Sequence, residues 1–221
     1  MVYVILIFAV LLGVLLARFF KNNNKITDWL LMFSGAYLLC ATFLHNLPLL
    51  YQKADESVWV FVVVGIIIQM ILESFSKGVE HGHVHHNQKI SASIVFGLMI
   101  HAFLEGMPLG EAHDHKNMIA AIAIHKIPVA TILYFYLTSV FHTMKKAYVV
   151  MLLFAFMTPL GTLISQYTVL NQYSYYILAL VSGVFIHIST TILFENSSKA
   201  HRLSWQKLIM LLISTFLVLM I

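Results

Sequence analysis

Long apolar runs alternate with short polar connections along the whole chain. A helix that crosses a bilayer needs about 20 mostly apolar residues, and runs close to this length recur eight times. They predict transmembrane helices at residues 2–20, 28–50, 58–76, 91–110, 118–140, 147–166, 174–194 and 205–221. The pattern therefore predicts an all-α polytopic membrane protein with eight transmembrane helices, organised as a single transmembrane domain over residues 1–221.

Composition supports this fold class and restricts the functions for which the chain has room. Hydrophobic residues make up 60% of the 221 residues and charged residues only 10%, whereas a soluble domain has roughly 25% charged residues. The eight runs leave only about 60 residues for connections and tails, and a soluble module needs about 50 or more by itself. We therefore expect no nucleotide-binding domain, kinase domain or other soluble module.

The basic residues are distributed as membrane topology requires. A net charge of +4 would suggest a nucleic-acid partner for a soluble protein, but cytoplasmic loops of membrane proteins carry an excess of Lys and Arg. Counted by alternate connections, Lys53 and Lys116 fall on one side of the membrane and ten basic residues fall on the other. The ten are Arg18, Lys21, Lys25, Lys77, Lys89, Lys145, Lys146, Lys199, Arg202 and Lys207. We expect the ten to be cytoplasmic, both termini to lie outside, and no nucleic acid to bind.

The third connection, residues 76–90, is rich in histidine and is cytoplasmic by this count. Its histidines are His81, His83, His85 and His86. Histidine-rich tracts are typical of metal binding, so one hypothesis is that this loop receives an ion on the cytoplasmic side. A hydrated linker without a tight site is the alternative.

Three ionisable side chains are predicted to meet near the middle of the membrane. His101 and Glu105 are four residues apart, so they lie on one face of a helix, one turn from each other. His125 lies at a similar depth in the next, antiparallel helix. Ionisable groups at this depth cost on the order of 2.5–3.5 kcal/mol each, and two imidazoles with one carboxylate form a zinc-binding set with an open fourth position. We expect a metal site here; a buried hydrogen-bonded network without an ion is the alternative.

A proline follows each part of this candidate site. Pro108 lies three residues beyond Glu105, and Pro128 lies three residues beyond His125. Proline removes one hydrogen bond of a helix, and the freed carbonyl is tolerated inside a membrane where it lines a polar cavity. We therefore expect both helices to be broken near the same depth, as at the substrate sites of transporters.

Five segments carry motifs in a recognisable order. They are SGAYLLCATFLHNLP, HAFLEGMPLG, HKIPVA, MTPLGTLIS and SGVFIHISTTILFE, in helices two, four, five, six and seven. HAFLEG is similar to HNxxEG, and HKIPVA to HxIPEG, of the Zrt/Irt-like protein (ZIP) family of divalent-metal transporters, and the resemblance covers most of the chain. It implies an eight-helix inverted-repeat bundle, often dimeric, with His101, Glu105 and His125 as first-site metal ligands.

The chain departs from the family pattern at the second metal position. The usual Asn or Asp after the histidine is replaced by Ala102 and Lys126, and the usual fifth-helix glutamate is Val129. Because a two-ion site needs a bridging carboxylate, these losses predict a single-ion site in which Lys126 replaces the second ion. Lys126 points about 100° away from His125 around the helix. One hypothesis is that its ammonium pairs with Glu105; snorkelling to an interface is the alternative.

The expected function is the transport of a divalent cation into the cytoplasm. The resemblance implies an elevator-like movement of a bundle made of helices one, four, five and six. A divalent ion that enters an interior 100 mV negative gains about 4.6 kcal/mol, so no ATP site is required and the chain is not expected to be an enzyme. Two nitrogen donors favour zinc as the transported ion, with iron, nickel and cobalt as alternatives.

Two further functions stay open, namely an intramembrane zinc-dependent hydrolase and a metal sensor. Histidines and an acid within lipid also form catalytic zinc sites, although the chain has no HExxH motif. His45 and His187, in the second and seventh helices, are either accessory residues of an ion pathway or structural histidines. We expect a multi-pass protein of a plasma membrane or bacterial inner membrane that works as a homodimer.

Overall fold

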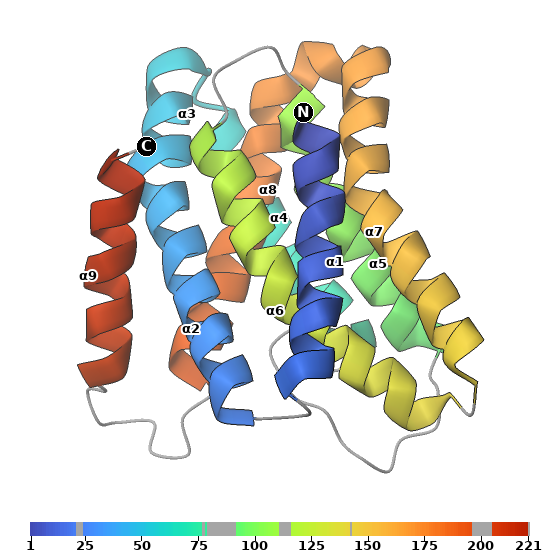
Figure 1. The fold of residues 1–221 in the computed structure, drawn as a ribbon. Helices are drawn as coiled ribbons and strands as arrows, with labels where there is room; N and C mark the ends of the chain where they lie inside the picture. The colour runs from blue at the N-terminus through green and yellow to red at the C-terminus, as the bar shows by residue number, and fades with distance from the viewer. Residues whose placement is uncertain are drawn as a thin grey trace.

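A computed structural model describes residues 1–20, 24–76, 78, 92–110, 116–141, 143–195 and 205–220. All regular elements in these residues are helical. The α-helices are α1 (Val2–Phe20), α2 (Asn24–Ala41), α3 (Leu47–Lys53), α4 (Val58–Ser76), α5 (Ala92–Gly106), α6 (Lys116–Val140), α7 (Met144–Tyr167), α8 (Ser174–Thr190) and α9 (Trp205–Met220). Figure 1 shows them as one bundle in which consecutive spans run in opposite directions.

Short π-helical and 3-10 segments extend several of these helices. π-Helical turns at Thr42–Asn46 and Thr191–Glu195 join α2 to α3 and extend α8, and 3-10 turns at Met107–Gly110 and Val169–Tyr173 follow α5 and precede α8. Among the described residues, seven spans are long and apolar enough to cross a membrane, and α9 is a shorter apolar helix of 16 residues. The predicted all-helical membrane fold is confirmed, whereas the π-helical turns were not expected.

The two prolines near the candidate site have different effects. α5 ends at Gly106 and continues through Pro108 as a 3-10 turn, so the expected break is present there. α6 runs from Lys116 to Val140 as one α-helix with Pro128 inside it, so the break expected at Pro128 is wrong. Proline removes a single backbone hydrogen bond, and the turns on either side of a buried proline are kept in place by neighbouring helices.

The helices pack in two groups. In the first group, α1 packs on α6 and α7, and α5 packs on α7. In the second group, α4 packs on α8, and α2 packs on α8 and α9. The groups meet mainly where α2 lies against α6 and where α4 lies against α5. We call them the ligand group (α1, α5, α6, α7) and the support group (α2, α3, α4, α8, α9). The ligand group consists of the four spans from which the family resemblance implies a moving bundle.

Glycines allow close packing inside each group. A Cβ added at Gly106 of α5 would lie 2.0 Å from a backbone carbonyl oxygen of α7, and one added at Gly161 of α7 would lie 2.0 Å from a carbonyl oxygen of α5. Gly65 of α4 and Gly183 of α8 approach each other's helices in the same reciprocal way. Helix backbones in membranes come this close where small residues face each other, so each of these two pairs is packed tightly along its glycine contact.

The outer faces of the bundle are apolar. Large hydrophobic side chains are exposed along the helices, among them Val4, Phe8, Leu152, Phe156 and Leu212. Soluble proteins rarely expose continuous apolar surface on this scale. These faces are therefore suited to contact with lipid acyl chains.

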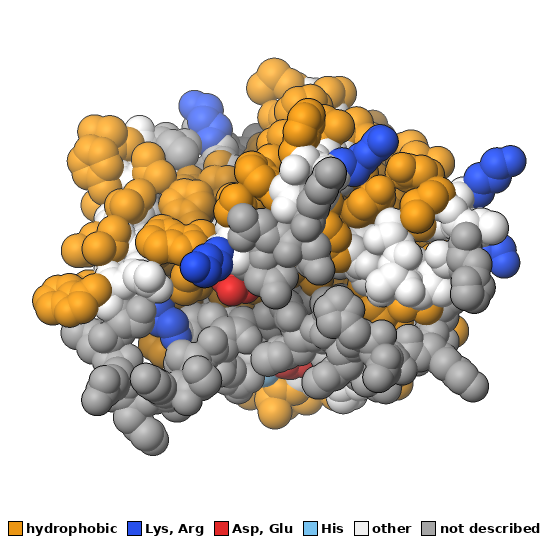
Figure 2. Space-filling model, turned by 60° about the horizontal axis from the view of Figure 1, so that its bottom comes forward, with side chains coloured by type: hydrophobic (Ala, Val, Ile, Leu, Met, Phe, Trp, Pro, Cys, Tyr) orange, Lys and Arg blue, Asp and Glu red, His pale blue; other side chains and the backbone are white. Residues whose placement is uncertain are grey.

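Basic side chains gather at one end of the bundle. Figure 2 shows Lys and Arg side chains around that end, to which the chain contributes Arg18, Lys25, Lys145, Lys146 and Lys207. Lys53 at the end of α3 and Lys116 at the start of α6 lie at the opposite end, where both chain termini also lie. Apart from Lys126 inside α6, the described basic residues therefore separate into the same two sets that alternate connections predict.

Candidate metal site

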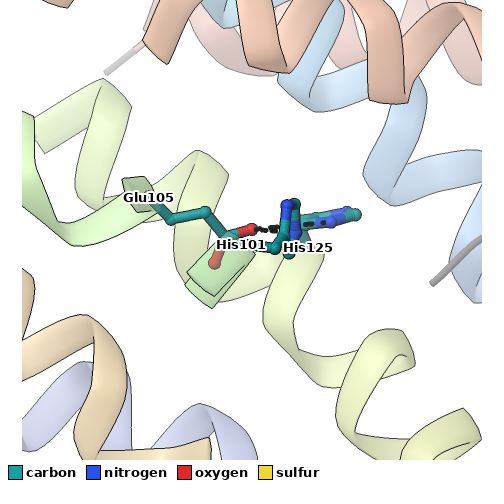
Figure 3. A group of neighbouring side chains, drawn as sticks. All are labelled: His101, Glu105 and His125. Atoms are coloured by element: carbon teal, nitrogen blue, oxygen red, sulfur yellow. Dashed lines mark ion pairs between the residues drawn. The ribbon is translucent and has the colours of Figure 1, made fainter. Parts of the chain in front are cut away.

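Two antiparallel helices bring together the three side chains expected to bind an ion. His101 lies in the middle of the span Ala92–Gly110, and Glu105 lies one helical turn further along the same face of α5. His125 approaches them from α6, and Figure 3 shows the Glu105 carboxylate pointing toward the imidazoles. Each of the three residues is only 1% exposed. The donors are thus enclosed by protein at mid-membrane depth.

The distances within this group suit a small divalent ion. His101 Nε2 lies 2.9 Å from Glu105 Oε1, and His125 Nε2 lies 3.7 Å from the same oxygen. One candidate ligand atom from each residue lies within 4.8 Å of the other two. A tetrahedral zinc ion with bonds of about 2.0–2.1 Å separates its ligand atoms by about 3.4 Å, a value between these two nitrogen–oxygen distances. The group therefore has the donor types and the spacing to hold a divalent ion through three protein ligands.

The second nitrogen of each imidazole faces a polar side chain of the support group. The two rings lie 6.0 Å apart between centroids and are inclined by 78°. His101 Nδ1 lies 3.3 Å from Gln69 Oε1 in α4, and His125 Nδ1 lies 3.5 Å from Ser34 Oγ in α2. Sequence reasoning missed both partners. The available signal for Gln69 was its position as a lone amide in an apolar run; Ser34 gave no comparable signal, because serine is common in such runs.

Lys126 contacts the other oxygen of Glu105. Its Nζ lies 3.3 Å from Oε2, while Oε1 faces the histidines. Nζ also donates a hydrogen bond to Thr158 Oγ1, which itself donates to the carbonyl oxygen of Ala102, and it lies 4.6 Å from the centre of the Phe154 ring. Lys126 is only 1% exposed, so it does not snorkel to an interface. The pairing with Glu105 is present as hypothesised, whereas the roles of Thr158 and Phe154 were not foreseen.

A known protein family matches more than half of this chain. Residues 80–221, which are more than half of the chain, match the family model described as ZIP zinc transporter. The chain belongs to the ZIP family. Comparison with individual curated proteins gives no match. ZIP proteins are transporters of divalent metals and not enzymes, so the hydrolase hypothesis is set aside.

Two other candidate histidines of this ZIP protein, His45 and His187, lie apart from the three buried donors. His187 Nε2 lies 2.6 Å from Glu73 Oε2 and connects α8 to α4 within the support group. His45 is partly buried in the π-helical turn after α2 and belongs to no metal-competent group among the described residues. The loop histidines lie outside the described residues: His81, His83, His85 and His86.

Proposed function

We propose that this ZIP protein moves zinc into the cytoplasm through a single site formed by His101, Glu105 and His125. The observation that carries the proposal is the convergence of three buried donors, with nitrogen to oxygen distances of 2.9 and 3.7 Å, in the middle of the bundle. Ionisable groups at membrane depth are costly and typically mark ion pathways. Imidazole nitrogens favour zinc and other late first-row ions over magnesium and calcium.

Lys126 supports a site for one ion. Its ammonium already contacts the oxygen of Glu105 that faces away from the histidines. Val129, which stands where a bridging carboxylate would be needed, is buried and offers no ligand atom. A second divalent ion would have to displace the ammonium without gaining a carboxylate in return.

The packing of the helices supports an elevator-type movement. The three candidate ligands lie on α5 and α6 and so belong to one group, which allows that group to move as a unit without separating the ligands. The membrane potential favours inward movement of a divalent ion by about 4.6 kcal/mol per 100 mV. On this proposal, the ligand group slides along α2 and α4 and exposes the ion first to the outside and then to the cytoplasm.

The remaining features of the proposal concern symmetry and placement. An inverted repeat is supported by the second and seventh spans, which both carry a Ser-Gly pair and a π-helical turn, at Thr42–Asn46 and Thr191–Glu195. The separation of basic residues supports outward termini. We include in the proposal a single domain over residues 1–221 and a homodimer in the plasma membrane or bacterial inner membrane.

Zinc uptake into proteoliposomes tests the proposed function. We expect uptake by the wild type, and at least about a tenfold loss of both zinc affinity and uptake in His101→Ala and Glu105→Ala, since each variant keeps only two of three protein ligands. Met99→Ala is the matched control, because residue 99 lies about 200° from residue 101 around α5. Wild-type uptake in both ligand variants would contradict the site. Zinc binding without any flux in the wild type would favour the metal sensor.

A further inference from the structure

Both candidate ligand histidines are contacted from outside the ligand group. Gln69 Oε1 lies 3.3 Å from Nδ1 of His101, and Ser34 Oγ lies 3.5 Å from Nδ1 of His125. Gln69 belongs to α4 and Ser34 to α2, the two helices along which the support group meets the ligand group. Both residues are fully buried. Each imidazole therefore faces Glu105 of the ligand group through Nε2 and a polar side chain of the support group through Nδ1.

The chemistry of the two contacts assigns a donor to each. An amide oxygen only accepts hydrogen bonds, so the bond to Gln69 Oε1 requires a hydrogen on Nδ1 of His101. The hydroxyl of Ser34 donates to the carbonyl oxygen of Leu31 at 2.8 Å, which leaves an oxygen lone pair for Nδ1–H of His125. When an ion is bound, hydrogen on Nδ1 leaves Nε2, the atom that faces Glu105, as the metal ligand. Metal-binding histidines are commonly oriented in this way through their second nitrogen.

We propose that Gln69 and Ser34 are positioning residues that make zinc affinity depend on the position of the ligand group relative to α4 and α2. In the present arrangement of the two groups, both acceptors lie within 3.5 Å of the histidine Nδ1 atoms. A hydrogen bond is lost once donor and acceptor separate beyond about 3.5 Å, so a slide of a few ångströms along α4 and α2 removes both acceptors. The imidazoles are then free to rotate, and the ion is held less tightly and is released. This inference rests on the proposed function.

Two variants remove the acceptors one at a time. Gln69→Leu replaces the amide with an apolar side chain of similar size, and Ser34→Ala removes only the hydroxyl. Gln69→Glu keeps an oxygen acceptor at the same position and is the conservative variant. Ser214→Ala is the matched control, because Ser214 is equally buried but lies on α9, which packs on α2 away from the ligands.

Zinc affinity, uptake kinetics and histidine tautomers are measured on the purified full chain. Loss of the outer partner of a metal-binding histidine typically weakens metal binding by about 10–100-fold, so we expect this increase in the zinc dissociation constant and in the KM of uptake for Gln69→Leu and Ser34→Ala. The maximum rate is retained, since release does not use these contacts. Gln69→Glu still accepts from Nδ1 and adds a negative charge, so it should bind zinc at least as tightly as the wild type, and Ser214→Ala should keep wild-type affinity. In the zinc-bound protein, nitrogen-15 NMR of labelled histidine should show Nδ1–H tautomers in the wild type and mixed tautomers in the two variants.

A cross-link separates positioning from general stability. A Cβ at residue 97 would lie 3.3 Å from Cβ of Phe75, near the range for a disulfide, so Phe75→Cys with Gly97→Cys holds α4 and α5 in the present arrangement. Locking should raise zinc affinity in the wild-type background and leave it unchanged when Gln69→Leu and Ser34→Ala are also present.

The outcomes distinguish this inference from the proposed function. Wild-type affinity and tautomers in both Gln69→Leu and Ser34→Ala would overturn the positioning role, as would a lower melting temperature with unchanged affinity. In either case, zinc uptake by the wild type would leave the proposed function intact. Failure of the wild type to bind zinc would overturn both.

Discussion

Replacing Lys126 with methionine removes the cation beside the candidate site while keeping a side chain of similar length. In the protein, Lys126 Nζ lies 3.3 Å from Glu105 Oε2 and is fully enclosed. The ammonium has two opposing effects: it stabilises the Glu105 carboxylate when no ion is present, and it repels a divalent ion bound on the other oxygen. We expect Lys126→Met to bind zinc more tightly and to be less stable without zinc.

The size of the first effect follows from the geometry. A zinc ion bonded to Oε1 at about 2 Å lies on the order of 6 Å from Nζ. Charges of +2 and +1 at this separation repel each other by about 1.4 kcal/mol at the dielectric constant of water and by about 5.5 kcal/mol at an effective value of 20. Since 1.4 kcal/mol is a factor of ten, zinc affinity should rise at least about tenfold. A buried carboxylate without its cation costs about 3–5 kcal/mol, which lowers the melting temperature of the metal-free variant.

Competition with a chromophoric chelator measures the first effect, and melting temperatures with and without zinc measure the second. The zinc-induced rise in melting temperature should be larger in Lys126→Met than in the wild type, because tighter binding and a less stable metal-free state act together. Lys126→Arg keeps the positive charge and should keep the zinc affinity of the wild type. Zinc affinity in Lys126→Met equal to or below that of the wild type would refute the electrostatic reasoning.

Two further predictions concern the helix groups. In a Cys40→Ser background, which removes the native cysteine, oxidation of the Phe75→Cys, Gly97→Cys protein should abolish zinc uptake but not zinc binding, because α5 can no longer slide along α4. Reduction of the disulfide should restore uptake. Uptake by the oxidised protein would contradict the elevator-type movement. Gly106→Ala places a Cβ 2.0 Å from the Thr158 carbonyl oxygen, so it should lower the free energy of unfolding by at least about 1–3 kcal/mol. A melting temperature in detergent equal to that of the wild type would show that α5 and α7 can separate at low cost.

Most helix positions could be predicted from hydropathy. The predicted span 58–76 coincides with α4 (Val58–Ser76), and the predicted span 28–50 lies within the longer span Lys25–Lys53. Each apolar run has to be helical in hydrocarbon, because only a helix or a closed barrel satisfies all backbone hydrogen bonds there. Span ends are less defined by sequence because polar residues near the interface are tolerated inside or outside the helix. The unbroken course of α6 through Pro128 depends on neighbouring helices and was not predictable.

The candidate ligands could be grouped from sequence, but their surroundings could not. His101 and Glu105 share a helix face because they are one turn apart, which is a local property of the chain. Gln69 is 32 residues from His101, and Ser34 is 91 residues from His125. These contacts exist because α4 packs on α5 and α2 packs on α6. Hydropathy gives no information on which faces of two apolar helices meet.

The sequence alone determined the membrane-spanning helices, the separation of basic residues and the set of donors at mid-membrane depth, because apolar run length, charge and helical spacing act within a few turns of one chain segment. Only the tertiary structure decided that Glu105 shares its two oxygens between the histidines and Lys126, and that the outer acceptors come from the opposite helix group. Such contacts depend on how the surfaces of distant helices fit together, and close packing selects one arrangement among several with the same hydropathy.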